Sequence, residues 1–188
     1  MSGAAALDLV SLFTEAGRRA YGEAVTQLAH ALQCAALAHR DRADDEVVVA
    51  ALLHDVGHLV ERQEDRPEHH HGSGGAAFVQ PYVPSRIAWL IEHHVIAKRY
   101  LCTVDARYVE HLSPASRHSY ALQGARLEPD EQLGLETRPW FVDAVRLRRW
   151  DDAAKVPGAA CPPLIEYAPL LERHFGPQAW TAGPGIDR

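Results

Sequence analysis

The chain has 188 residues, of which 47% are hydrophobic, and this is typical of a globular domain and too apolar for an intrinsically disordered chain. Its 19 Lys and Arg residues are outnumbered by 25 Asp and Glu residues, which gives a net charge of −6 with neutral histidines. Because no global positive field is available, we expect neither nucleic acid nor an anionic membrane as a partner. An anionic substrate would have to be attracted locally.

Apolar residues recur at helical spacing along most of the chain, and no segment alternates strictly, so we predict an all-α fold. The segment VVVAALLHDVGHLV, which follows the acidic residues Asp44, Asp45 and Glu46, predicts a long central buried helix. We assign residues 1–188 to one domain, with 181–188 as a flexible tail. The other helices are expected over residues 5–19, 25–40, 84–101, 114–123, 139–156 and 164–175, with a loop over 61–75 and a short helix ending near Pro81.

The three cysteines, Cys34, Cys102 and Cys161, are odd in number, far apart and never in a CxxC pair. This pattern argues against a disulfide framework and against a cysteine zinc site. Acidic residues interrupt the N-terminal segment, which has no basic stretch leading into an apolar one, and no segment approaches the ~20 apolar residues of a membrane span. We therefore expect a cytoplasmic protein.

Histidine is the compositional outlier, with 12 copies against 4 Phe and 1 Met. His54 and Asp55 stand in the middle of the predicted central helix, where a buried carboxylate costs several kcal/mol unless its charge is compensated. A metal ion would compensate it, and so would a satisfied His–Asp pair in the core. At about 100° per residue, His58 is expected on nearly the same helical face as His54, with Asp55 to the side.

Other histidines and aspartates stand on or beside apolar helical faces in separate parts of the chain. His30 has apolar neighbours one turn away on either side, and His94 ends the apolar segment IAWLIEHH. His71 closes a His triplet that begins at His69, and Asp151 lies late in the chain. Imidazole and carboxylate donors without a thiolate suit iron, manganese or zinc. Such a set predicts a metal cluster within a helical bundle.

The order H…HD…H…H…D resembles the HD-domain metalloproteins, which are all-α folds with one or two metals at the His-Asp pair. Five blocks in order, within residues 20–158, are similar to the phosphonate-degrading HD-domain oxygenases of the PhnZ type. These blocks cover residues 21–28 (YGEAVTQL), 54–58 (HDVGH), 97–102 (AKRYLC), 113–123 and 147–155 (LRRWDDAAK). The resemblance implies an HD-domain helical bundle with a buried dinuclear metal site.

The resemblance also implies the ligands of a mixed-valent Fe(II)/Fe(III) pair. His30, His54, Asp55 and Asp151 would surround one iron, His71 and His94 the other, and Asp55 would bridge the two. For His71, the neighbouring His69 and His70 remain alternatives. With Asp55 and Asp151 ionised, two irons carrying +5 would leave about +3 to attract a phosphonate.

The activity implied by the resemblance is cleavage of the C–P bond of a small 1-hydroxyphosphonate with O2, which gives phosphate and a carboxylic acid. With 2-amino-1-hydroxyethylphosphonate or its trimethylammonio analogue the acid would be glycine or glycine betaine. Hydroxymethylphosphonate is the alternative substrate. A metal-dependent phosphohydrolase is a rival reading, since the same fold can activate water against phosphate esters. A non-catalytic HD-like module is another rival.

Six residues are implied as substrate-binding: Tyr21, Glu23, His58, Lys98, Ser116 and Gln123. His58 stands where many hydrolytic HD proteins carry lysine, and Tyr21 is one residue closer to Glu23 than is usual in the family. Lys98 follows His94 by four residues, so it shares a helical face and could clamp the phosphonate, or it could be a solvated lysine. Ser116 and Gln123 could bind phosphonate oxygens or cap helices.

Glu23 has an alternative reading, and Arg148 is expected to act outside the substrate site. Glu23 could pair with a substrate ammonium group or cap the helix that is predicted to begin at Val25. Arg148 is expected to contact Asp151 from the side away from the metal.

Overall fold

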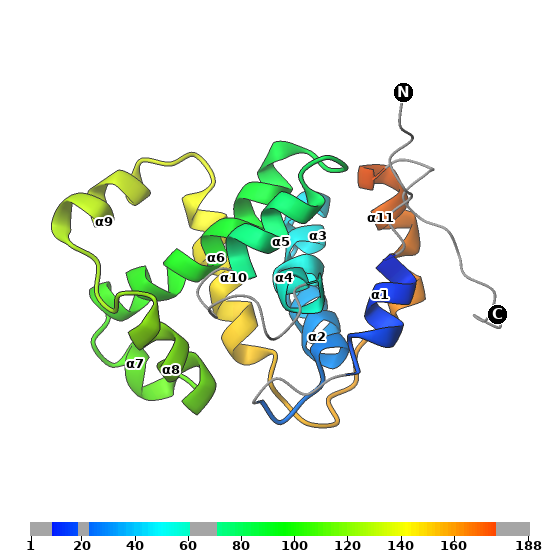
Figure 1. Cartoon of the computed structure of the whole chain (residues 1–188), viewed down its shortest axis with the longest axis horizontal. Coiled ribbons are helices and arrows are strands. Elements are labelled where there is room, and N and C mark those ends of the chain that lie inside the picture. Colours follow the sequence, from blue (N-terminus) through cyan, green and yellow to red (C-terminus); the bar gives the residue numbers. More distant parts are fainter. Residues whose placement is uncertain (1–8, 19–22, 61–70, 176–188) are drawn as a thin grey trace.

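The computed structural model describes residues 9–18, 23–60 and 71–175. These residues form helices joined by turns, and no β-strand occurs among them, which confirms the predicted all-α fold. Figure 1 labels α1 (Leu9–Glu15), α2 (Gln27–Arg40), α3 (Asp45–Leu53), α4 (Val56–Val60), α5 (His71–Val79), α6 (Ser85–Val104), α7 (Tyr108–His111), α8 (Pro114–Leu122), α9 (Pro129–Glu136), α10 (Phe141–Ala153) and α11 (Ala168–Phe175). A 3-10 helix, η2 (Leu164–Tyr167), precedes α11.

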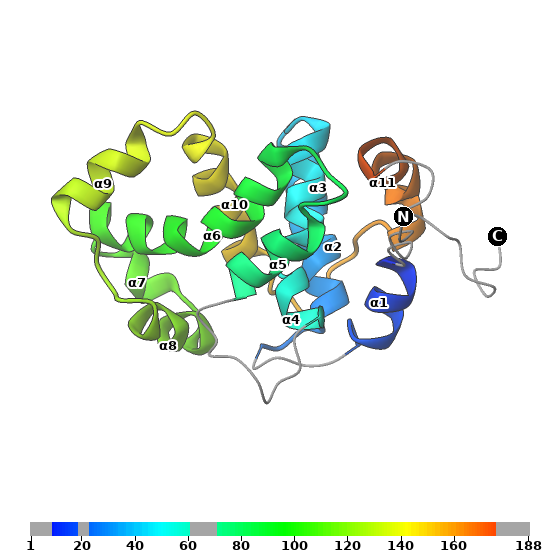
Figure 2. The same ribbon diagram turned by 45° about the horizontal axis from the view of Figure 1, so that its top comes forward.

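Helix α3 is the centre of the core, as its apolar sequence predicts. Every residue from Val47 to Leu53 is at most 2% exposed, so after Asp45 and Glu46 no face of this helix meets solvent. Helices α2, α6, α10 and α11 pack around it. Figure 2 shows α3 between α6 on one side and α11 on the other. Three of the elements that carry candidate ligands, α2, α6 and α10, are therefore held against one buried helix.

Side-chain caps fix where several helices begin. Thr26 accepts a hydrogen bond from the N–H of Ala29 (3.2 Å) at the start of α2, and Asp44 accepts one from Val47 (3.2 Å) at the start of α3. Because Thr26 caps α2, the reading of Glu23 as the cap of this helix is wrong.

The predicted helix boundaries need corrections. The helix predicted over 5–19 ends at Glu15 among the described residues, and the loop predicted to reach Gly75 ends earlier, because α5 already begins at His71. Helices α7 and α9 were not predicted, since their short segments bury almost no apolar surface. Both lie at the end of the molecule opposite α1 and α11 (Figures 1 and 2). The predicted tail 181–188 lies outside the described residues.

The central segment is not one continuous helix, so that prediction is wrong. Helix α3 ends at Leu53 and α4 begins at Val56, with His54 and Asp55 in the turn between them. At the start of α4, the N–H of His58 donates a hydrogen bond to the carbonyl of Asp55 (2.9 Å), three residues earlier, which is the spacing of a 3-10 turn. The expected placement of His58 on the same helical face as His54 therefore does not apply, because the helical rotation is interrupted between them.

Within the described part of the chain, no helix combines the length and the apolar character that a membrane crossing requires. All three cysteines are free, in agreement with the predicted absence of a disulfide framework.

Candidate metal centre

Six side chains from five places in the fold meet in the interior. His30 comes from the middle of α2, His54 and Asp55 from the turn between α3 and α4, His71 from the first residue of α5, His94 from α6 and Asp151 from the end of α10. The four histidines are between 0% and 7% exposed and Asp151 is 4% exposed. The structure therefore brings all six of the predicted ligands together.

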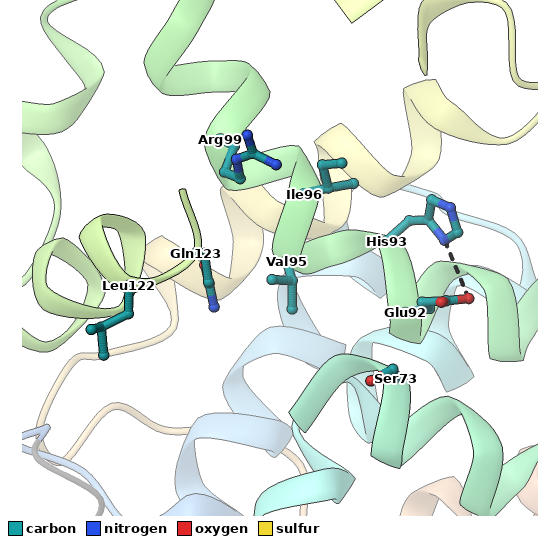
Figure 3. A pocket seen from close by; sticks show the side chains of 8 residues that line it. All are labelled: Ser73, Glu92, His93, Val95, Ile96, Arg99, Leu122 and Gln123. Carbon is teal, nitrogen blue, oxygen red and sulfur yellow. Dashed lines mark ion pairs between the residues drawn. The ribbon is translucent and has the colours of Figure 1, made fainter. Parts of the chain in front are cut away.

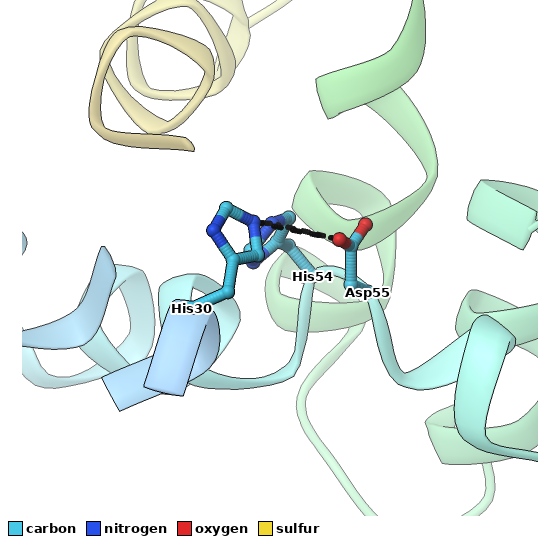
Figure 4. A group of neighbouring side chains, drawn as sticks. All are labelled: His30, His54 and Asp55. Carbon is cyan, nitrogen blue, oxygen red and sulfur yellow. Dashed lines mark hydrogen bonds and ion pairs between the residues drawn. The ribbon is translucent and has the colours of Figure 1, made fainter. Parts of the chain in front are cut away.

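One oxygen of Asp55 faces the first group of donors. Its Oδ2 lies 3.5 Å from Nε2 of His30 and 3.5 Å from Nε2 of His54, and these two nitrogens are 3.0 Å apart. Figure 4 shows the two imidazoles and the carboxylate turned toward one another. Asp151 completes the group, because its Oδ1 lies 3.3 Å from Nε2 of His30 and 3.9 Å from Nε2 of His54.

The other oxygen of Asp55 faces the second group. Its Oδ1 lies 3.8 Å from Nε2 of His71 and 3.6 Å from Nε2 of His94, and these two nitrogens are 3.2 Å apart. Two sets of three donors thus share Asp55, and each set is compact enough to hold a metal ion.

Backbone carbonyls fix the tautomer of three of these imidazoles. Nδ1 of His30 donates to the carbonyl of Ala154 (2.9 Å), and Nδ1 of His54 donates to Ala51 (2.9 Å). Nδ1 of His94 donates to Ile91 (2.6 Å) in the same way. In a neutral imidazole the proton on Nδ1 leaves a lone pair on Nε2, which is the arrangement of a metal-binding histidine.

This donor set fits metal ions. Nε2 atoms that both carry lone pairs repel each other at 3.0 Å, unless a positive charge lies between them. Two nitrogens that bind one ion at about 2.0–2.1 Å and at right angles lie about 3 Å apart, which matches this spacing. The carboxylate of Asp55 agrees with this fit, because imidazoles face both of its oxygens and a largely buried carboxylate requires a compensating positive charge.

The pKa values show how strongly the carboxylates act on this centre. Burial alone would lower the pKa of His30, but hydrogen bonds to Asp151 and Asp55 raise it to about 10. Burial lowers the pKa of His54 to about 4, although the two aspartates oppose this shift. The facing imidazoles, chiefly His54, hold the pKa of Asp55 well below its usual range against the effect of burial. A proton on His30 thus takes the place of a metal ion, and the two compete.

Gly57 allows α5 to approach the centre. A Cβ atom at this position would lie 2.1 Å from the backbone oxygen of His71, so only glycine fits where α4 and α5 meet. Gly75 contributes to the same close approach, since its Cβ would lie 3.0 Å from the backbone nitrogen of Gly57. The sequence shows Gly57 between Asp55 and His58 but does not reveal which backbone it meets.

Arg148 contacts Asp151 from the side away from the imidazoles. Its Nη1 lies 2.6 Å from Oδ2 of Asp151, while Oδ1 of this carboxylate faces the histidines. Arg148 also binds Asp152, through Nε (3.1 Å) and a close contact from Nη2. The hydroxyl of Tyr108 donates to Asp152 (2.5 Å). This geometry separates the roles of the adjacent aspartates, since Asp151 turns to the imidazoles and Asp152 anchors Arg148.

Three cationic side chains converge on one turn of α8. Lys98 donates to the hydroxyl of Ser119 (2.6 Å), while Arg148 (3.3 Å) and Lys155 (2.8 Å) both donate to the hydroxyl of Ser116. We call these five residues the cation cluster. Lys98 is 2% exposed, so the reading as a solvated lysine is wrong. Burial lowers its pKa to about 7, and the charge of Arg148 adds to the shift. The sequence does not reveal Ser119 and Lys155 as members of this cluster, because their partners Lys98 and Ser116 are distant along the chain.

Two other predicted substrate residues, His58 and Gln123, have neighbours outside the cation cluster. The ring of His58 stacks on that of His71, with ring centroids 4.3 Å apart. Gln123 lies at the end of α8, and neither polar atom of its side-chain amide has a hydrogen-bond partner. It lines a pocket of about 360 Å³ between α5, α6 and α8, together with Ser73 and Arg99 (Figure 3). Tyr21, His69 and His70 lie outside the described residues.

Comparisons with known proteins show the family of this chain. A family model described as "HD domain" matches residues 24–133. Hydroxymethylphosphonate dioxygenase from Gimesia maris is 43% identical over 87% of this chain and 85% of its own length. The glycine-betaine-forming [1-hydroxy-2-(trimethylamino)ethyl]phosphonate dioxygenase from Leisingera caerulea is 34% identical over 86% of each chain. This chain belongs to the HD-domain family.

Within that family, the resemblance to the PhnZ type is confirmed, because both of these relatives are hydroxyphosphonate dioxygenases. An uncharacterized protein of Acanthamoeba polyphaga mimivirus, L432, is also 32% identical over 87% of this HD-domain chain and 78% of its own length. The match to the family model ends before Asp151 and Lys155, so these side chains join the HD-domain centre from a later part of the chain.

Proposed function

We propose that this HD-domain protein is a dioxygenase that cleaves the C–P bond of a small 1-hydroxyphosphonate. The products are inorganic phosphate and a carboxylic acid. Each of them gains one oxygen atom from O2, so one O2 is consumed per bond broken. The relatives' activities support this class of reaction.

The single observation that carries the proposal is the division of donors around Asp55. One carboxylate oxygen faces His30 and His54, and the other faces His71 and His94. In this arrangement His30, His54, Asp55 and Asp151 would hold one iron ion, and Asp55, His71 and His94 would hold a second. When bound, the irons supply the redox chemistry with O2.

The cation cluster supports the choice of a phosphonate as substrate. Lys98, Arg148 and Lys155 are held by buried ion pairs and hydroxyl groups on one side of the centre, where an anionic group would meet several N–H and O–H donors. Lys98 is assigned to bind the phosphonate, and Ser116 and the free amide of Gln123 to orient its oxygens. Arg148 holds the carboxylate of Asp151 in place.

Oxygen dependence tests the proposed reaction directly. With 1-hydroxyphosphonates as substrates, we expect phosphate release in air, one O2 consumed per phosphate, and no release under anaerobic conditions. Among metal-free samples reloaded with Fe(II), Mn(II) or Zn(II), only the iron sample should be active. Phosphate release that persists without O2, or release from a simple phosphate ester, would favour the hydrolase instead. A purified protein that retains no metal would favour a non-catalytic module.

The lowered pKa of Lys98 predicts a specific pH dependence of kcat/KM. With a pKa lowered to about 7, its ammonium group is charged below this pH and neutral above it. The kcat/KM for the phosphonate should therefore fall as the pH rises through about 7. Lys98→Arg keeps the charge at every accessible pH, so this fall should disappear in the variant. The substrate ionises identically in both assays, so its own titration cannot account for a difference between the two enzymes. A pH profile of Lys98→Arg that matches that of the wild type would contradict the role of Lys98.

A further inference from the structure

The side chain of Glu23 is already paired within the chain. Its Oε1 lies 3.0 Å from Nζ of Lys155 and accepts a hydrogen bond of 2.5 Å from the hydroxyl of Ser113. Both partners of this ion pair are largely buried, with 9% of the Glu23 side chain and 13% of the Lys155 side chain exposed. The charge of Glu23 is therefore compensated by a lysine of the protein, in a place shielded from solvent.

Lys155 also connects Glu23 to the cation cluster. Its Nζ donates to the hydroxyl of Ser116 (2.8 Å) and lies 3.8 Å from Oδ1 of Asp151. Because Asp151 faces His30, the pair formed by Glu23 and Lys155 lies at the edge of the candidate metal centre. A substituent on C1 of a phosphonate bound between the metal centre and the cation cluster would meet this pair.

A cationic substituent is disfavoured at such a position. A second ammonium group at Glu23 would stand beside that of Lys155, and two like charges a few ångströms apart in a poorly solvated place repel strongly. It would also have to displace hydrogen bonds that Ser113 and Lys155 already make. An uncharged substituent, or a hydrogen atom, avoids both costs.

We propose that Lys155 determines the substrate specificity by occupying the carboxylate of Glu23, so that this protein selects a 1-hydroxyphosphonate without a cationic substituent, of which hydroxymethylphosphonate is the smallest. This inference rests on the proposed dioxygenase function and names its substrate class. Lys155 acts here through Glu23 and is a positioning residue for the specificity.

The test compares kcat/KM for hydroxymethylphosphonate with kcat/KM for 2-amino-1-hydroxyethylphosphonate. The ratio of the two constants cancels losses of metal or of folded protein, since these affect both substrates equally. We expect the wild type to favour hydroxymethylphosphonate about tenfold or more, and Lys155→Gln to move the ratio about tenfold toward the aminated substrate. Lys155→Arg keeps the cation and should keep the ratio.

A second variant isolates the carboxylate. If the shift in Lys155→Gln arises from a freed Glu23, adding Glu23→Gln should abolish it. The inference is overturned if the wild type prefers the aminated substrate, if Lys155→Gln leaves the ratio unchanged, or if the shift survives in the double variant.

Binding separates this inference from the proposed reaction. Calorimetric titration of both phosphonates under anaerobic conditions reports the same preference without turnover. Preferential binding of hydroxymethylphosphonate that Lys155→Gln reverses, without any O2-dependent phosphate release, would support the specificity and refute the dioxygenase. O2-dependent phosphate release from both compounds, with no preference in binding or turnover, would support the dioxygenase and refute the specificity.

Discussion

Replacing Asp55 with asparagine is expected to abolish turnover, with kcat lowered about a thousandfold or more. The two oxygens of this carboxylate face different pairs of imidazoles, so it belongs to both donor sets. Asparagine offers one carbonyl oxygen and an amide nitrogen that cannot bind a metal ion. The metal content measured on the purified variant should fall to half that of the wild type or lower.

Asp130→Asn is the matched control for this substitution. Asp130 lies exposed in α9, far in sequence from every candidate ligand, and the change removes the same charge. We expect this variant to keep its metal and its activity. Full metal content in Asp55→Asn would contradict the bridging role of Asp55, even if activity were lost.

Replacing Gly57 with alanine is expected to remove the second donor set while leaving the first in place. The new Cβ would meet the backbone oxygen of His71 at 2.1 Å, which forces α5 away from α4 and carries His71 with it. Overpacking of this kind costs about 1–3 kcal/mol of stability. Elemental analysis should show reduced metal content, and urea unfolding should show a lower free energy of unfolding.

Gly134→Ala serves as the control, because a Cβ at Gly134 has no neighbour within 4 Å and the residue lies inside α9. This change should leave the metal content intact and alter stability by less than about 1 kcal/mol, in the stabilising direction. If Gly57→Ala matched Gly134→Ala in both stability and metal content, the close approach of α4 and α5 would not be required for the site.

The local sequence is sufficient to predict the helical class, the central position of α3 and the identity of the histidines and aspartates. Because Asp55 stands in an apolar segment, its negative charge requires compensation, and the many histidines of the sequence point to a metal ion as its source. The break at His54 and Asp55 could not be predicted in the same way. An uninterrupted apolar segment is compatible with one long helix, and the turn serves contacts with α5 and α6 that are distant in sequence.

Which partner each polar side chain meets depends on how the helices cross. Asp151 and Asp152 are adjacent and chemically identical, and only the packing of α10 against α2 and α7 turns one toward His30 and the other toward Tyr108. The pairing of Glu23 with Lys155 joins residues more than a hundred positions apart. The sequence thus determined the chemistry available to the protein, because side-chain type and burial pattern are local properties. The tertiary structure decided which groups share a metal and which are neutralised, because those depend on distances of a few ångströms between separate helices.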